Sequence, residues 1–143
     1  MNATSDNRPY ARALDRLKAV NLRPTRQRLA LAKLLFDGAD RHVTAEQLHA
    51  EAVAADMRVS LATVYNTLHQ FTAVGLLREV VVESGRAYFD TNTGDHHHFY
   101  HVEDGRLEDI NPDRLAVAPL PAPPGDTAIE RVDVIIRVRN RQE

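Results

Sequence analysis

Cysteine and tryptophan are absent from this chain of 143 residues, and long apolar runs are absent as well. The lack of cysteine excludes disulfide bonds, thiolate zinc sites and cysteine nucleophiles. No run of about 20 apolar residues is available for a membrane-spanning helix. The first seven residues are polar, so we expect no secretory signal and a cytoplasmic location. The apolar content of 43% and the charged content of 27% are ordinary for a globular protein.

The net charge of −2 hides an uneven distribution of charged residues. Residues 1–89 contain 12 basic and 9 acidic side chains, whereas residues 90–143 contain 6 basic and 11 acidic ones. Within the first 36 residues, eight basic residues stand against two acidic ones. This distribution is typical of a protein whose N-terminal part meets phosphate groups, although a solvated helical face would look the same.

Four helices are expected in the first half of the chain. Apolar residues at helical spacing predict helices over residues 9–20 and 25–37. Thr44, with Gln47 three residues later, forms a capping box that opens a third helix. Ser60 caps a fourth helix, whose apolar side consists of Leu61, Val64, Leu68 and Phe71.

A β-hairpin is expected directly after the fourth helix. Residues 77–82 are β-branched and strand-like, residues 83–86 form a turn, and residues 87–90 return. Helices followed by a hairpin are typical of a winged helix-turn-helix, in which the fourth helix here would enter the major groove of DNA. The predicted fold class is α+β, with an N-terminal winged helix-turn-helix followed by a small, mostly β dimerisation domain. A helical bundle is the structural alternative.

The fourth predicted helix has a polar surface opposite its apolar side. Small residues there allow close approach to DNA, and hydroxyl and amide groups can contact bases or phosphates. The alternative is a helix that merely has a polar face. The residues that we predict to contact DNA, with the basic segment before the second helix included, are Arg23, Thr25, Arg26, Ser60, Ala62, Thr63, Tyr65 and Asn66.

Residues 91–95 are polar and are expected to form a hinge. They would separate a DNA-binding domain, residues 1–90, from a second domain, residues 96–143, for dimerisation and ligand sensing. In this second domain, residues 97–110 predict another hairpin and residues 128–139 predict a long strand, with a proline-rich stretch between them.

The second predicted domain is too small to bury much apolar surface alone. Three strands in about 50 residues leave an open sheet edge, so we expect a homodimer formed through this domain. A dimer would present two recognition helices to double-stranded DNA that carries an inverted-repeat operator.

Three consecutive histidines, His96, His97 and His98, are the most distinctive chemical feature of the chain. Clusters of neutral imidazoles bind transition metals or haem iron. In a strand, His96 and His98 point to one face and His97 points to the other. Placed behind a DNA-binding domain, the cluster predicts a switch controlled by a ligand.

Over residues 21–110, the chain resembles the ferric uptake regulator (Fur) family. Within that family it looks most like the iron response regulators of rhizobia and related alphaproteobacteria, because of the run Asp95–Phe99 and the missing cysteine pairs. The motifs that carry the family resemblance are LRPTRQR at 22–28, HVTAEQL at 42–48, SLATVYNTL at 60–68, and Phe89-Asp90 leading into the three histidines.

The resemblance implies a DNA-binding regulator of iron and haem homeostasis, not an enzyme. It implies a site for Mn²⁺ or Fe²⁺ and no structural zinc bound by four cysteines. The metal ligands that it implies are His42, Asp90, His97 and Asp109. The histidines that it implies for haem are His96, His97, His98, His42, His49 and His69.

Other functional classes stay open at this point. An ordinary Fur-type repressor would sense Fe, Mn or Zn without haem, and a haem or metal carrier would need no DNA. A metalloenzyme would use the histidines to activate water, but the sequence has no HExxH motif. Single histidines also have structural alternatives, since His49 and His69 could be surface residues and His42 a loop residue.

Overall fold

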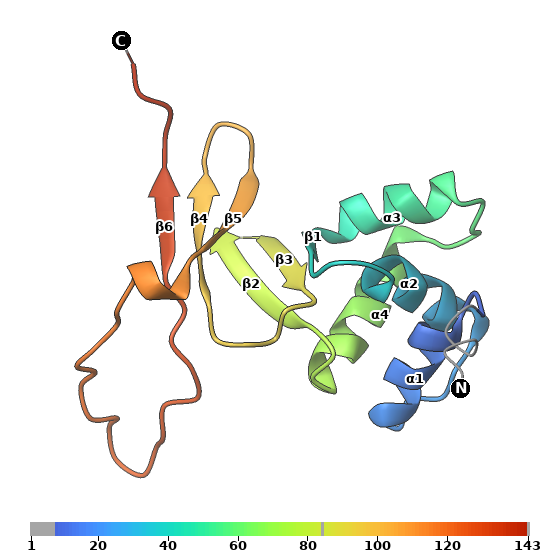
Figure 1. Ribbon diagram of the computed structural model, residues 1–143, viewed down its shortest axis with the longest axis horizontal. Coiled ribbons are helices and arrows are strands. Elements are labelled where there is room, and N and C mark those ends of the chain that lie inside the picture. Colours follow the sequence, from blue (N-terminus) through green and yellow to red (C-terminus); the bar gives the residue numbers. More distant parts are fainter. Residues whose placement is uncertain (1–7, 84, 143) are drawn as a thin grey trace. The chain divides into compact units, whose positions relative to one another are not determined.

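The computed structural model describes residues 8–83 and 85–142. The chain divides into two compact units, and the division falls between Thr93 and Gly94. The N-terminal unit contains α1 to α4 and β1 to β3, and the C-terminal unit contains β4 to β6 (Figure 1). Among the described residues, no helix is both long and apolar enough to cross a lipid bilayer. The predicted α+β class is confirmed.

The helices begin where the capping patterns predict. Thr25 accepts a hydrogen bond from the backbone N–H of Arg28, and Ser60 accepts one from Thr63. Both halves of the predicted capping box at Thr44 are present. These side chains satisfy N–H groups that have no partner within the helix. The bounds are Ala11–Ala19 for α1, Arg26–Phe36 for α2, Ala45–Ala54 for α3 and Leu61–Ala73 for α4.

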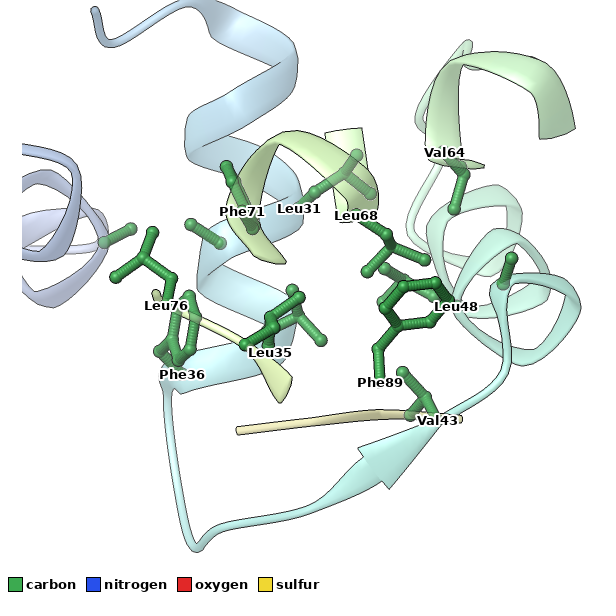
Figure 2. Packing of buried hydrophobic residues seen from close by; sticks show 14 of the residues in the cluster. Leu31, Leu35, Phe36, Val43, Leu48, Val64, Leu68, Phe71, Leu76 and Phe89 are labelled. Carbon is green, nitrogen blue, oxygen red and sulfur yellow. The ribbon is translucent and has the colours of Figure 1, made fainter. Parts of the chain in front are cut away.

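The core of the N-terminal unit lies where α2, α3 and α4 meet the small sheet (Figure 2). The apolar side predicted for α4 is buried there, with Val64, Leu68 and Phe71 all at 0% exposure. Phe71 packs against Phe36 of α2, with ring centroids 6.4 Å apart. Burial of this apolar side fixes which face of α4 remains at the surface.

A three-stranded antiparallel sheet completes the N-terminal unit, in the order β1-β3-β2. The hairpin of β2 (Arg78–Glu83) and β3 (Arg86–Asp90) is the predicted wing. The sequence pattern did not predict β1 (His42–Val43), because a strand of two residues has no detectable periodicity. The register of β1 pairs His42 with Asp90.

The C-terminal unit is a second three-stranded sheet, in the order β5-β4-β6. The predicted hairpin forms from β4 (His97–His101) and β5 (Arg106–Ile110), and β6 (Ile135–Val138) pairs in parallel with β4. The long strand predicted over residues 128–139 is wrong in extent. Strand structure is confined to the four residues that pair with β4, because a strand needs a neighbour for its backbone hydrogen bonds.

Candidate metal centre and nucleic-acid interface

Two histidines and one aspartate converge on the buried face of the C-terminal sheet. Nε2 of His98 lies 3.2 Å from Oδ1 of Asp109, and Nε2 of His96 lies 3.8 Å from the same oxygen. The imidazoles of His96 and His98 are 6% and 2% exposed, whereas the Asp109 side chain is 53% exposed. We call these three residues the His-Asp group.

The geometry of the His-Asp group follows from strand alternation and register. His96 immediately precedes β4, and alternate residues place its side chain on the same face as that of His98, with ring centroids 4.5 Å apart. His98 is the cross-strand partner of Asp109 in β5, so both side chains lie on one face of the sheet. The sheet thus brings together residues that are 11 positions apart in the sequence.

A backbone carbonyl orients the first imidazole of the group. His96 Nδ1 lies 2.7 Å from the carbonyl oxygen of Gly94. Because a carbonyl only accepts hydrogen bonds, Nδ1 must carry the proton, and the lone pair of the neutral ring is then on Nε2. Histidines that bind metals usually donate a hydrogen bond from one ring nitrogen to the protein in this way, which fixes the tautomer and the orientation of the ring.

The donor set fits a divalent transition metal. Two imidazole nitrogens and a carboxylate oxygen suit ions such as Mn²⁺, Fe²⁺ and Zn²⁺. One potential ligand atom from each residue lies within 4.8 Å of the others. Ligand atoms about 2.1 Å from one ion are separated by about 3–4 Å, so a small inward adjustment of the side chains would bring all three within bonding distance of one ion.

His97 lies on the opposite face of the sheet from the His-Asp group. Its Nδ1 accepts a hydrogen bond from the backbone N–H of Val134, at 3.1 Å. The histidine that the structure pairs with Asp109 is therefore His98, and not the His97 of the metal-ligand set implied by the resemblance. His101 shares the face of His97 and contacts Glu108, with Nε2 and Oε1 2.9 Å apart.

The remaining implied ligands lie in the N-terminal unit. Asp90 is 1% exposed, accepts a hydrogen bond from the backbone N–H of Asn92, and is paired with His42 across β1 and β3. His49 Nε2 lies 3.0 Å from the carbonyl oxygen of Val59. The ring of His69 is in edge contact with that of Phe89. The structure thus brings His42 and Asp90 together but gives His49 and His69 separate local partners.

A basic groove runs between α2 and α4. It has a volume of about 540 Å³, and its lining includes two arginines and no acidic residue. Four of the residues predicted to contact DNA line the groove, namely Arg23, Thr25, Thr63 and Asn66. Arg26, Ala62 and the cap residue Ser60 are exposed but do not line it. The full lining is Arg23, Thr25, Gln27, Arg28, Thr63, Asn66, Thr67 and Gln70.

Tyr65 is held by a contact that the sequence did not indicate. Its hydroxyl donates a hydrogen bond to Oε2 of Glu46 in α3, at 2.9 Å, and its ring stacks on that of His69. The hydrogen bond to Glu46 raises the pKa of Tyr65 above its ordinary value, since it favours the protonated phenol. The sequence did not indicate the contacts of Glu46 and Arg28, because their partners Tyr65 and Gln70 lie 19 and 42 positions away, beyond any local pattern.

Comparison with known proteins identifies the class and then the family. The chain resembles solved structures of ferric uptake regulators from Pseudomonas aeruginosa, described with manganese, and from Vibrio cholerae. Both superpositions have a TM-score of 0.68 and include 98% of the known chain. They include 91% and 88% of this chain, at 23% and 19% sequence identity. These structures show the fold, which is that of a two-unit winged-helix protein.

Sequence comparison establishes the family. Residues 19–119 match the family described as "Ferric uptake regulator family". The ferric uptake regulation proteins of Cupriavidus metallidurans and Bordetella parapertussis are 37% and 36% identical over 66% and 57% of this chain. These alignments span 66% and 58% of the length of the two relatives, which is less than two thirds in both cases. The chain belongs to the ferric uptake regulator family, whose members are transcription regulators and not enzymes.

Proposed function

We propose that this protein is a cytoplasmic, homodimeric transcription regulator that binds operator DNA in response to a divalent metal at the His-Asp group. The observation that carries the proposal is the convergence of two buried imidazoles and one carboxylate within 4.8 Å. Two structures with a similar fold support the choice of ion, since one is a ferric uptake regulator from Francisella tularensis with iron and the other is a zinc-bound manganese uptake regulator.

The chemistry of the three side chains explains why an ion would matter there. His96, His98 and Asp109 would hold the metal, which would supply positive charge and tie β4 to β5. Gly94 fixes the His96 ring through its carbonyl, so the nitrogen lone pair is directed before any ion arrives. The two imidazoles are almost fully buried, and buried groups of this kind lose little conformational entropy on binding.

The N-terminal unit would supply the contacts to DNA. Burial of Val64, Leu68 and Phe71 leaves the opposite side of α4 at the surface, with Asn66 exposed and Thr63 partly exposed. Arg23 and Arg28 in the basic groove would neutralise backbone phosphates. A homodimer, which we infer from the small size of the C-terminal sheet, would place two such surfaces on an inverted repeat.

Metal binding would act by shifting a population of domain arrangements. We infer a hinge over residues 91–95, with the arrangement favoured by the ion matching the spacing of the operator half-sites. A coupling of about 1–3 kcal/mol would change DNA affinity by about 5–150-fold.

Haem is the second ligand that the resemblance implies, as in the iron response regulators. If both histidines were axial ligands of one haem, the porphyrin plane would lie between the two imidazole rings. The 4.5 Å between the ring centroids of His96 and His98 is too short for that, so a haem would require the two rings to separate. For this reason we place the divalent ion first and include haem in the test.

The test compares ligand binding and DNA binding in the same protein. Apo-protein is titrated by calorimetry with Mn²⁺, Fe²⁺ and Zn²⁺ and by Soret absorption with haemin, and DNA binding is then followed in each state. The double variant His96→Ala/His98→Ala should lose the metal response, and His101→Ala, on the opposite face of the same strand, should keep it. Equal metal affinity in the double variant would refute the site, and a saturating Soret band with release of DNA would favour haem.

A further inference from the structure

The orientation of the Gln70 side-chain amide in the basic groove is fixed by its hydrogen bonds to Arg28. Nε and Nη2 of Arg28 donate hydrogen bonds to Oε1 of Gln70, at 3.3 and 3.1 Å. Nη1 of Arg28 donates to the carbonyl oxygen of Arg23, at 2.9 Å. A guanidinium group has N–H donors and no acceptor, so only the oxygen of the amide can face it. The amide nitrogen of Gln70 must therefore point away from Arg28.

This direction leaves Gln70 with donors alone to offer to a ligand. Gln70 is exposed in the third turn of α4 and lines the groove together with Thr63 and Asn66 of the same helix. Within residues 8–83 and 85–142, its Nε2 has no hydrogen-bond acceptor. A glutamine that can turn freely pairs with adenine through both amide atoms, whereas one whose oxygen is engaged cannot.

The surroundings of Gln70 select the kind of acceptor. The groove lining contains Arg23 and Arg28 and no acidic side chain, so an anion is favoured over a neutral base edge. The sugar-phosphate backbone also receives half or more of the hydrogen bonds that proteins make to DNA.

We propose that Gln70 donates a hydrogen bond to one backbone phosphate in each operator half-site, and that Arg28 is the positioning residue that fixes the direction of its amide. This inference rests on the proposed DNA-binding function. It assigns to Gln70 a contact that is independent of base sequence, and it gives Arg28 a role that is distinct from neutralising charge.

The test removes single phosphate charges from the DNA. The probe is a duplex selected from a random library by the Mn²⁺-loaded protein, in which methylphosphonates replace one linkage at a time. Gln70→Ala should weaken binding by about tenfold for each half-site, and so by about a hundredfold for the dimer, because each subunit loses one charge-assisted hydrogen bond. One linkage in each half-site should then become insensitive to replacement in Gln70→Ala while staying sensitive in the unmodified protein. Gln27→Ala, in the same groove, is the matched control and should retain the full pattern.

Two further variants separate positioning from charge. Arg28→Met should reduce sensitivity at the same linkage, and Arg28→Lys should restore part of it, because an ammonium group also only donates. Gln70→Glu keeps a partner for Arg28 but lacks the donors and adds negative charge, so it should bind DNA more weakly than Gln70→Ala. Thermal unfolding of each variant shows whether folding is unchanged.

Several outcomes would overturn the proposal. A change in base preference in Gln70→Ala, with an unaltered linkage pattern, would make Gln70 a base contact. Saturable shifts of the Gln70 amide resonances with inorganic phosphate, and no linkage effect in DNA, would assign the groove to a free anion. If the unmodified protein selects no duplex with any metal, the proposed function itself fails, which is a different result from binding without a linkage-specific effect.

Discussion

Arg41 and Glu51 form an ion pair that joins two helices to the loop before β1. Nη1 of Arg41 donates to Oε1 of Glu51 at 2.9 Å and to the carbonyl oxygen of Leu34 at 3.1 Å, while Nη2 contacts the second carboxylate oxygen. The backbone of Arg41 is also hydrogen-bonded to Thr91 in both directions. The side chain of Arg41 thus links α2 to α3, and its backbone links both to the segment that follows β3.

Loss of the Arg41 side chain should destabilise the N-terminal unit. Because the pair is about one third exposed, solvent screening limits its contribution, and we expect Arg41→Ala to lower the free energy of unfolding by about 1–2 kcal/mol. Lys33→Ala removes the ion pair between Lys33, which is 40% exposed, and the C-cap residue Asp37, and should cost under about 0.5 kcal/mol. Urea denaturation followed by circular dichroism measures both. Equal losses would show that the contact to Leu34 adds nothing.

The buried side of α4 should be far more sensitive to truncation. Leu68 has 0% exposure, so Leu68→Ala should lower the free energy of unfolding by about 2–5 kcal/mol through lost contacts and a residual cavity. Val81→Ala, at a side chain on β2 that is 60% exposed, should change stability by less than about 0.5 kcal/mol. Thermal unfolding of the two variants compares them directly, and a small effect at Leu68 would contradict the assigned core.

The pKa of Tyr65 provides a test of its contact with Glu46. The hydrogen bond raises the pKa of Tyr65 in the folded protein above the ordinary value of about 10. The stability that this hydrogen bond contributes is therefore complete below about pH 10 and is lost as the pH rises through the pKa of Tyr65 in the folded protein. Glu46→Gln removes the carboxylate charge and should lower the pKa of Tyr65 toward 10. NMR titration of ring-labelled tyrosine reports the change, and Asp15→Asn on α1 serves as a control. An unchanged pKa in Glu46→Gln would contradict the contact.

Asp109 should contribute to metal affinity through its charge. Asp109→Asn keeps the size of the side chain but removes the anionic oxygen nearest to both imidazoles, and we expect the affinity for Mn²⁺ to fall by about tenfold or more. Asp113→Asn, in the short 3-10 helix Pro112–Arg114, removes an acid that is not in the His-Asp group and should leave the affinity unchanged. Calorimetric titration with Mn²⁺ measures the affinity of both variants. An equal loss of affinity in the two would indicate a general effect of charge and would contradict a direct role for Asp109.

The sequence predicted those features that depend on local signals. The caps at Thr25, Thr44 and Ser60 and the buried side of α4 need only residues within a few positions of one another. The wing hairpin could be predicted for the same reason. The full extent of β6 could not, because the strand exists only where β4 pairs with it, more than 30 residues earlier in the chain.

The site could be predicted in kind but not in composition. Alternation showed that His96 and His98 share a face, but only the register between β4 and β5 shows that Asp109 belongs with them and not with His97. The contact between Arg28 and Gln70 spans 42 positions and depends on how α2 packs on α4. Neither relation leaves a repeating pattern in the sequence.

The turn between β4 and β5 matters when the His-Asp group is compared with related sequences. The four residues from Val102 to Gly105 set the register that places Asp109 opposite His98. A change in the turn that shifted the register by one residue would place the aspartate on the other face, although His96, His98 and Asp109 would all still be present in the alignment. The presence of these three residues in a relative does not by itself show that their side chains share one face of the sheet. The pairing that this short turn sets is therefore as informative about the His-Asp group as the identity of its three residues.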